Sequence, residues 1–241
     1  MSETVAAGSK LCPITRWNFG RVYSGRSCIS ARVMEVAAQY GLGVDDTREV
    51  RVVPEFHLDT LPGQVVFVTG ASGGGKSTVL RQVVEQAKIS LQLEKVTLNA
   101  GVPLVDLFGD SADAAMRLLG YVGLGEAFLA LRKVGELSDG QAFRAHLAGF
   151  AALIEGMEGS PGALTLVADE FCSTLDRLTA QCVTRCFLRM VRKRGLTLFL
   201  ASAHSDLIGA IDPDVLIDAE LGWWRISERI GGKWRSQTLE I

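Results

Sequence analysis

Apolar positions follow two different periodicities along the chain. The runs "QVVFVT", "LTLVA" and "TLFLA" are short and almost wholly apolar, which is typical of buried strands. The stretches "STVLRQVVEQA" and "LTAQCVTRCFLRMVRK" carry apolar residues three and four positions apart, which is typical of helices. Because such strands and helices alternate, the pattern predicts an α/β fold with a mostly parallel sheet.

Two further stretches add smaller layers to this core. Residues 111–153 are rich in Ala and Leu, and they predict a short helical subdomain at about residues 103–153. The segment "REVRVVPEFHLDTLPGQVV" alternates apolar and polar residues and carries turn signals at Pro54 and at Pro62-Gly63. It predicts a small antiparallel β layer that precedes the first buried strand.

The N-terminal part of the chain has less pattern. Residues 1–20 predict little regular structure, and "CISARVMEVAAQYGLG" then predicts a short helix that is stopped by Gly41 and Gly43. We therefore expect an N-terminal segment with a short helix, residues 1–45, followed by one domain, residues 46–241.

A cluster of glycines separates the first buried strand from its helix in "GASGGGKSTV". Gly70, Gly75, Lys76 and Ser77 fit the spacing G-x-x-x-x-G-K-[ST], in which backbone amides and a helix N-terminus cradle phosphates. Lys76 would reach the β- and γ-phosphates, and the Ser77 hydroxyl would bind Mg²⁺. A glycine-rich turn without a ligand is the alternative, but strand, loop and helix follow in the order that phosphate binding requires. The residues predicted to bind nucleotide are Gly70, Ala71, Ser72, Gly73, Gly74, Gly75, Lys76, Ser77 and Thr78.

Two carboxylates end the second buried strand in "LTLVADE". Asp169 can hold Mg²⁺ through its water shell, and Glu170 can orient or deprotonate an attacking water. Two solvated carboxylates at a strand end are the alternative, and this stretch alone does not decide between them.

The segment "ELSDGQAFRAHLAGF" predicts the start of a helix. Ser138 and Gln141 form the S-x-x-Q pattern of a capping box, which explains both residues without a ligand. The same helix N-terminus, with the Ser138 hydroxyl and the bare backbone of Gly140, is also suited to bind an anion. The two interpretations are compatible.

Two shorter motifs complete the series. "STLD" follows the acidic pair and ends in Asp176, and "ASAHSDL" places His204 directly after the third buried strand. A histidine at a strand end is more often structural than catalytic when it stands alone. The order of all five motifs, however, is a joint pattern that chance rarely produces.

This series resembles the ABC-type ATPases, a family of P-loop NTPases, over roughly residues 50–218. "GASGGGKS" is similar to Walker A, "LSDGQ" to the LSGGQ signature, "LVADE" to Walker B, "STLD" to the D-loop, and His204 to the switch histidine. "ISARVMEVAAQYGLG", "LSDGQAFRAHLA" and "PDVLIDAELG" further resemble a small group of soluble, non-transporter ABC ATPases from prokaryotes and their viruses, some of them fused to a GNAT-like acetyltransferase domain. We expect no acetyltransferase domain within these 241 residues.

The resemblance implies that two copies of the chain sandwich two ATP molecules, each held by Walker A of one copy and the signature of the other. Hydrolysis of ATP to ADP and phosphate would then drive a conformational change in a protein partner. The implied catalytic residues are Glu170, His204 and Lys76, the implied magnesium ligands are Ser77 and Asp169, and the implied nucleotide contacts across the dimer are Ser138, Gly140, Gln141 and Asp176.

Three features depart from the family pattern. Asp139 replaces the first glycine of the signature and puts a carboxylate into the first turn of the helix. Asp106 stands where transporter ATPases usually place the Q-loop glutamine, and it is a third candidate magnesium ligand. No aromatic residue before Walker A is a clear stacking partner for adenine. Phe56 is the nearest, but a core role is the stronger expectation for it, so base selectivity stays open.

Composition limits the possible binding partners and the cellular location of the protein. The chain has 25 Lys and Arg against 27 Asp and Glu, a formal net charge of −2, so its charge demands neither nucleic acid nor an anionic membrane as partner. Its apolar runs are far shorter than the roughly 18 residues of a membrane span, and its start lacks a secretory signal, so we expect a cytoplasmic protein without membrane insertion. Five cysteines, an odd number, fit reduced thiols, and we expect Cys182 and Cys186 to be buried rather than to hold a metal.

Three other functions stay open at this point. The chain could be the nucleotide-binding subunit of an ABC transporter, although the missing glutamine and the short helical region disfavour this. It could be a P-loop kinase acting on a nucleic-acid or small-molecule substrate, but "LSDGQ" and "STLD" would then have no purpose. A DNA-associated ATPase is supported only by "RCFLRMVRKRG", whose basic residues also complement the dipole at a helix C-terminus.

Overall fold

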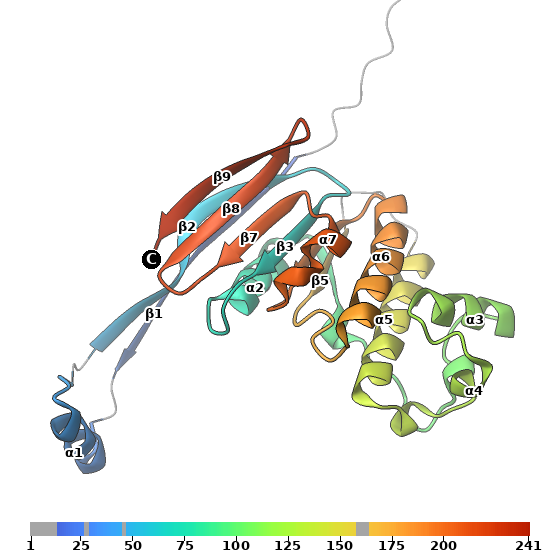
Figure 1. Cartoon of the computed structure of the whole chain (residues 1–241), viewed down its shortest axis with the longest axis horizontal. Helices are drawn as coiled ribbons and strands as arrows, with labels where there is room; N and C mark the ends of the chain where they lie inside the picture. Colours follow the sequence, from blue (N-terminus) through green and yellow to red (C-terminus); the bar gives the residue numbers. More distant parts are fainter. Residues whose placement is uncertain (1–13, 27–28, 45–46, 158–163) are drawn as a thin grey trace, which may run out of the picture.

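The computed structural model of the chain describes residues 14–26, 29–44, 47–157 and 164–241 (Figure 1). The strands are β1 (Thr15–Arg26), β2 (Thr47–Thr60), β3 (Val65–Thr69), β4 (Ile89–Gln92), β5 (Leu164–Ala168), β6 (Thr197–Ala201), β7 (Val215–Ala219), β8 (Trp223–Ile230) and β9 (Lys233–Glu240). The helices are α1 (Ala31–Tyr40), α2 (Lys76–Gln86), α3 (Ala112–Tyr121), α4 (Ala127–Ala130), α5 (Asp139–Gly156), α6 (Arg177–Lys193) and α7 (Ile208–Ile211). Short 3₁₀ turns are η1 (Leu93–Lys95), η2 (Leu104–Asp106), η3 (Val134–Glu136) and η4 (Ser205–Leu207).

A mostly parallel sheet forms the centre of the molecule. Its described strands lie in the order β4-β5-β6-β3-β7-β8-β9, parallel from β4 to β7 and antiparallel from β7 to β9. The α/β fold predicted from the alternating strands and helices is confirmed. Because the carboxyl ends of parallel strands lie at one edge of a sheet, the loops after β3, β5 and β6 meet there.

Apolar side chains of the central strands divide between the two faces of this sheet. In β3, Val65 and Phe67 pack into the core that contains residues of α5 and α6. Val66 and Val68 point the other way, into the core shared with α2 and the two strands β1 and β2. Since neighbouring side chains point to opposite faces, a strand covered on both faces needs an unbroken apolar run.

The strands β1 and β2 form a separate two-stranded antiparallel sheet. Trp17 of β1 is buried, donates from Nε1 to Thr60 Oγ1 at 2.8 Å, and packs edge-on against Phe199 of β6. The Gln86 side chain of α2 bonds both the N–H and the C=O of Asn18 at 2.8 Å, much as a third strand would. The antiparallel layer predicted before the first buried strand is confirmed, and these contacts anchor it to the core.

Two details of the N-terminal prediction are wrong. Little regular structure was predicted over residues 1–20, yet β1 begins at Thr15 and pairs with β2 along its whole length. Pro54 does not lie in a turn; it lies within β2 beside a shift in the register, where the missing N–H of a proline is tolerated. The turn at Gly63 and the end of α1 at Gly41 are confirmed, and both glycines have positive φ.

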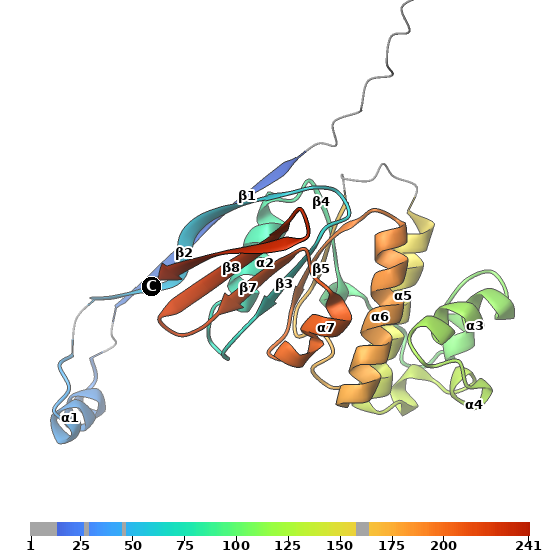
Figure 2. The ribbon, with the colours of Figure 1, turned by 45° about the horizontal axis from the view of Figure 1, so that its top comes forward.

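The two ends of the molecule carry different helices (Figure 2). The helices α3 and α4 and the start of α5 lie at one end, whereas α1 lies at the other, at the tip of the extended ribbon that β1 and β2 form. The carboxyl ends of β3 and β5 lie between them. In the part of the chain that the structure describes, no helix is long and apolar enough to cross a membrane.

Candidate functional site

The loop that joins β3 to α2 requires its glycines for two reasons. A Cβ on Gly70, which has a φ of +122°, would lie 2.2 Å from the carbonyl oxygen of Ala219 in β7. Gly75 has a φ of +96°, and a Cβ there would lie 2.7 Å from the carbonyl oxygen of Val52. Close backbone approach and left-handed backbone geometry both exclude larger side chains, so the shape of the loop explains its composition.

Lys76 closes this loop from within. Its Nζ donates to the carbonyl oxygens of Gly70 and Ala71 at 2.9 and 2.7 Å. The helix α2 begins at Lys76, its N-cap Gly75 provides no side-chain cap, and its first turn contains no acidic residue. A helix N-terminus with uncapped amides and an adjacent ammonium group attracts anions.

The acidic turn, residues 169–170, follows β5 in a strained conformation. Glu170 has a φ of +45°, a left-handed conformation that residues with a Cβ seldom adopt. Its N–H donates to Asp169 Oδ1 at 3.0 Å, and the N–H of the fully buried Phe171 donates to the carbonyl of Ala201 in β6 at 2.8 Å. Because Phe171 is anchored in the core, the exposed Glu170 side chain is left on the outside of the turn.

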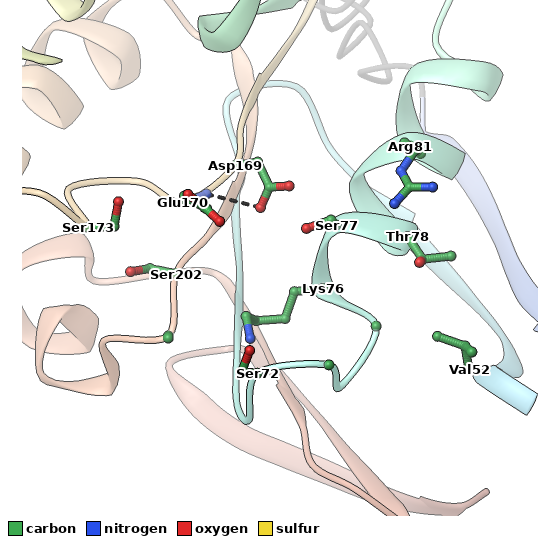
Figure 3. A pocket seen from close by; sticks show the side chains of 13 residues that line it. Val52, Ser72, Lys76, Ser77, Thr78, Arg81, Asp169, Glu170, Ser173 and Ser202 are labelled. Atoms are coloured by element: carbon green, nitrogen blue, oxygen red, sulfur yellow. Dashed lines mark hydrogen bonds between the residues drawn. The ribbon is translucent and has the colours of Figure 1, made fainter. Parts of the chain in front are cut away.

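The loop and the acidic turn line one cavity of about 410 Å³ (Figure 3). Ser77 and Asp169 face each other across it, and both offer oxygen ligands, which Mg²⁺ prefers. The structure thus brings both acidic residues together with most of the predicted loop residues. The lining consists of Val52, Ser72, Gly73, Gly75, Lys76, Ser77, Thr78, Arg81, Asp169, Glu170, Ser173, Ser202 and Ala203.

His204 lies next to this cavity. Ser202 and Ala203, which follow β6, line the cavity, and the half-buried His204 comes directly after them. The His204 N–H donates to Ser202 Oγ at 3.3 Å, while its ring is not part of the lining described above. Because β6 lies between β5 and β3 in the sheet, its C-terminal loop reaches the site that their loops form.

The signature residues lie outside the cavity lining. Ser138 Oγ accepts from the Gln141 N–H at 3.4 Å, and Gln141 Oε1 accepts from the Ser138 N–H at 3.1 Å, so the predicted capping box is confirmed. A Cβ on Gly140 would lie 3.2 Å from Leu175 Cδ2, so the start of α5 packs against the "STLD" segment of its own chain. Neither these three signature residues nor Asp139 contribute to the described lining of the cavity.

The "STLD" segment connects the cavity to the signature. Ser173 lines the cavity, Leu175 contacts Gly140, and Asp176 caps α6 by accepting from the Thr179 N–H at 3.0 Å. Hydrogen bonds from the Thr179 side chain and backbone lower the pKa of the Asp176 carboxyl. The segment therefore runs from one predicted half of the nucleotide site to the other.

Glu94 is a candidate that the sequence analysis missed. Gln92 of β4 pairs with Val167 of β5, which sets η1 beside the end of β5, and Glu94 Oε1 accepts from the Asp169 N–H. Desolvation raises the pKa of Glu94, as do the nearby charges of Asp169 and Glu170, while the hydrogen bond from Asp169 opposes the rise. The available signal was a carboxylate two positions after the strand-like "ISLQ".

Asp106 is not brought to the cavity. It is exposed in η2 and lines neither the cavity above nor the adjacent one of about 380 Å³, to which Glu94 and Arg81 contribute. Its predicted role as a magnesium ligand gains no support from this position. Arg81 of α2, which the sequence analysis did not single out, lines both cavities.

Two expectations about other side chains have opposite outcomes. Phe56 stacks on Phe19 with ring centroids 4.6 Å apart and packs against the core, so its core role is confirmed. Cys182 and Cys186 are exposed, so the expectation that they are buried is wrong. Across residues 14–26, 29–44, 47–157 and 164–241, no group of three or more His, Cys, Asp or Glu side chains could hold a metal ion.

Known proteins share parts of this sequence. No protein-family model matches the chain. The lipoprotein-releasing system ATP-binding protein LolD of Geobacter metallireducens is 29% identical over 215 residues, which cover 73% of this chain and 89% of that protein. The aliphatic sulfonates import ATP-binding protein SsuB 1 of Xanthomonas axonopodis pv. citri is 31% identical over 187 residues, which cover 65% of this chain and 70% of that protein.

Solved structures share the fold. The dimeric bacterial ABC transporter cassette MJ0796 matches with a TM-score of 0.55 at 15% identity, over 86% of this chain and 94% of that one. Its post-hydrolysis dimer bound to ADP and Pi matches with a TM-score of 0.58 at 16% identity, over 91% of this chain and 100% of that one. Identities this low establish the fold alone, whereas the relative at 31% identity matches over 70% of its length. Fold, motifs and this relative together show that the chain belongs to the ABC-type ATPases, a family of P-loop enzymes that bind ATP with Mg²⁺ and hydrolyse it.

Proposed function

We propose that the chain hydrolyses ATP as a sandwich dimer and that the cycle moves an attached partner. The observation that carries this proposal is the separation of two helix N-termini that are both suited to bind anions. The cavity contains the phosphate loop and the acidic turn, whereas the start of α5 lies outside it. A second copy would bring its Ser138 and Gly140 to the γ-phosphate held by the first. Each site is then incomplete in one copy and complete in two.

Within one copy, the loop and the acidic turn share the chemistry. The amides at the start of α2 bind the phosphates together with Lys76, whose Nζ exchanges the loop carbonyl oxygens for phosphate oxygens. Ser77 and Asp169 would hold Mg²⁺, which would neutralise phosphate charge there. Glu170 orients and deprotonates the attacking water, and His204 contacts the γ-phosphate.

Hydrolysis becomes motion because both copies bind the same γ-phosphate. Its loss removes the group that bridges the phosphate loop of one copy and the signature of the other, so the two copies separate. The "STLD" segment supports this coupling, since Ser173 lines the cavity and Leu175 contacts Gly140. Asp176 at its end would connect the two sites across the dimer.

Tyr23 is our candidate for contacting the base. It pairs with Val50 of β2, two residues before the cavity-lining Val52, and it is 46% exposed. An exposed aromatic ring in this position can stack on adenine. Weaker ATP binding by Tyr23→Ala but not by Tyr23→Phe would support this role, and equal affinity of both variants and the wild type would refute it.

The partner could be of two kinds. The relatives named above are ATP-binding proteins of a lipoprotein-releasing system and of a sulfonate importer, which favours a second candidate function as the nucleotide-binding subunit of a transporter. The missing Q-loop glutamine and the resemblance to non-transporter ABC ATPases favour a partner outside the membrane. Co-purification of the tagged chain with an integral membrane protein would decide for the transporter.

A nucleic-acid partner has weaker support. Of the basic residues near the end of α6, Arg192 pairs with Asp214 at 3.4 Å, and Arg194 donates to the carbonyl oxygen of Ile154 at 3.3 Å. These contacts give the basic residues a structural role at the helix C-terminus.

Mixing two inactive variants tests the composite site. Lys76→Ala should lose ATP turnover because its own loop fails, and Ser138→Arg because it blocks the site of its partner. A mixed dimer still contains one site with the intact loop of Ser138→Arg and the intact signature of Lys76→Ala. Turnover that returns on mixing supports the proposal. A mixture of folded variants that stays as inactive as each variant alone would refute it.

A further inference from the structure

Glu94 lies beside the acidic turn because β4 and β5 are parallel neighbours. The register pairs Gln92 with Val167, so the residues that follow each strand emerge side by side at the same edge. Two positions further along each chain segment come Glu94 and Asp169. Their hydrogen bond, from the Asp169 N–H to Glu94 Oε1, joins residues that are 75 positions apart.

Glu94 provides a hydrogen-bond acceptor for an N–H that lies beyond the end of the sheet. The strand β5 ends at Ala168, so Asp169 lies beyond its ladder. A carboxylate acceptor bonds an N–H more strongly than a neutral one. Glu94 therefore holds the first residue of the acidic turn from outside the turn.

The conformation of Glu170 depends on its neighbours. Its left-handed backbone persists only where surrounding contacts fix it. Asp169 Oδ1 accepts from the Glu170 N–H at 3.0 Å, and the Glu170 carbonyl accepts from the Ser173 N–H at 3.0 Å. The hydrogen bond to Glu94 is thus the first of a short chain of bonds that runs through Asp169 to Glu170.

Glu94 is itself held in place by the core. Its neighbour Leu93 is only 4% exposed and belongs to the core that also contains residues of α5 and β5. The turn η1 packs against both of these elements. An anchored acceptor can fix a strained turn, whereas a freely moving surface side chain could not.

We propose that Glu94 is a positioning residue for hydrolysis: it accepts the Asp169 N–H and thereby aims Glu170 at the attacking water, without contacting ATP. This inference rests on the proposed role of Glu170. Since the phosphates are held by the loop and α2, loss of the Glu94 acceptor should disturb the chemical step and leave ATP binding intact.

Three variants separate this role from others. Glu94→Ala removes the acceptor, and Glu94→Gln keeps an acceptor oxygen without the charge. Glu85→Ala is the matched control, because Glu85 lines the same 380 Å³ cavity but pairs with Arg21 at 3.4 Å. We expect Glu94→Ala to lower kcat about 10- to 100-fold, the cost of a small misplacement of a catalytic group, and to change the KM for ATP less than about twofold. Glu94→Gln and Glu85→Ala should stay within about threefold of the wild-type kcat.

Combination with Glu170→Gln provides a second test. If Glu94 acts through Glu170, adding Glu94→Ala to Glu170→Gln should cause no further loss of kcat, because effects of residues that act as a unit are not additive. A further loss as large as that of the single variant would show that Glu94 acts independently and would overturn the proposal.

Amide exchange measures the hydrogen bond without ATP. In the nucleotide-free protein the Asp169 N–H should exchange faster in Glu94→Ala than in the wild type, Glu94→Gln or Glu85→Ala. Faster exchange together with the lower kcat supports the proposal. Unchanged exchange, or a wild-type kcat in Glu94→Ala, refutes the positioning role while the proposed function stands. A wild type that does not hydrolyse ATP refutes the proposed function itself.

Discussion

The two helix N-termini of the proposed site are built differently. The helix α2 begins at Lys76 without a side-chain cap, at the wall of the cavity. The helix α5 begins with Ser138 and Gln141 capping each other, outside the cavity. The first N-terminus has amides that need an external acceptor, whereas the second is partly satisfied within its own chain. In the proposed dimer we therefore expect α2 to bind phosphate first and α5 of a second copy to close on phosphate already bound.

The cap of α5 does not prevent this second role. Ser138 Oγ accepts from the Gln141 N–H, and its own O–H remains available to donate to a phosphate oxygen. The capping box is therefore compatible with the proposed functional role of "LSDGQ", which stays a prediction. The predictions that follow perturb first the α2 half of the site and then the α5 half.

Removal of the ammonium group beside α2 should have the largest effect. Lys76→Ala should weaken ATP binding about 100-fold, because charge-assisted hydrogen bonds to phosphate contribute roughly 1.5 to 3 kcal/mol each. Equilibrium titration with a fluorescent ATP analogue measures this, with Lys95→Ala as a control for loss of a nearby positive charge. Unchanged affinity of Lys76→Ala would mean that the loop does not bind phosphates.

Two glycines of the loop should differ in their tolerance of a methyl group. Gly70→Ala should cost about 3 kcal/mol of unfolding free energy or more, because its Cβ would meet the Ala219 carbonyl at 2.2 Å. Gly73→Ala, which has a φ of +80° but no neighbour within 4 Å, should cost roughly 1 to 2 kcal/mol. Urea unfolding compares them. Equal losses of unfolding free energy in the two variants would show that the close contact between Gly70 and β7 does not restrict the side chain at position 70.

On the α5 half, Asp139 should restrain turnover. Its carboxylate lies in the first turn of the helix that would face the γ-phosphate, so Asp139→Gly should raise ATP turnover or affinity about two- to fivefold. Asp139→Asn, which removes only the charge, should act in the same direction. If turnover and affinity fall in both variants, the carboxylate serves the helix N-terminus or a partner contact instead.

Thiol labelling should distinguish the buried cysteine that follows the acidic turn from the two exposed cysteines of α6. It requires no substitution and so perturbs the protein least. Burial raises the pKa of Cys172, behind the acidic turn, to about 12, so at pH 8 its thiolate is scarce and inaccessible. Cys182 and Cys186 on α6 are exposed. Iodoacetamide followed by mass spectrometry should modify the latter two and spare Cys172 in the native protein. Equal modification of all three would show that the acidic turn opens readily.

Local patterns in the sequence predicted most of the fold and much of the site. The loop, the capping box and the acidic strand end each depend on residues a few positions apart, and such short-range geometry is readable from spacing. The cap at Ser138 and the burial of β3 illustrate this. The cluster of the loop and the acidic turn followed from the parallel order of their strands.

What the sequence did not predict depends on contacts between distant segments. Glu94 meets Asp169 because of the register between β4 and β5, and no local pattern encodes a register between strands 75 positions apart. The strand β1 likewise depends on its pairing with β2, which brings Trp17 to Thr60, and this pairing is not visible in the local sequence. The exposure of Cys182 depends on which elements pack against α6, and the spacing of residues along a helix does not predict those elements.

The composite dimer is tested most directly by sedimentation of Glu170→Gln. This substitution keeps the size of the side chain and removes the carboxylate that would activate water, so ATP should stay bound. Since a ligand bound across an interface favours the associated state, Mg-ATP should shift the variant from monomer to dimer, and ADP should shift it less. Ser138→Arg in the same background should block the shift. A Glu170→Gln protein that stays monomeric in saturating Mg-ATP, or hydrolyses ATP at the wild-type rate, would contradict the sandwich.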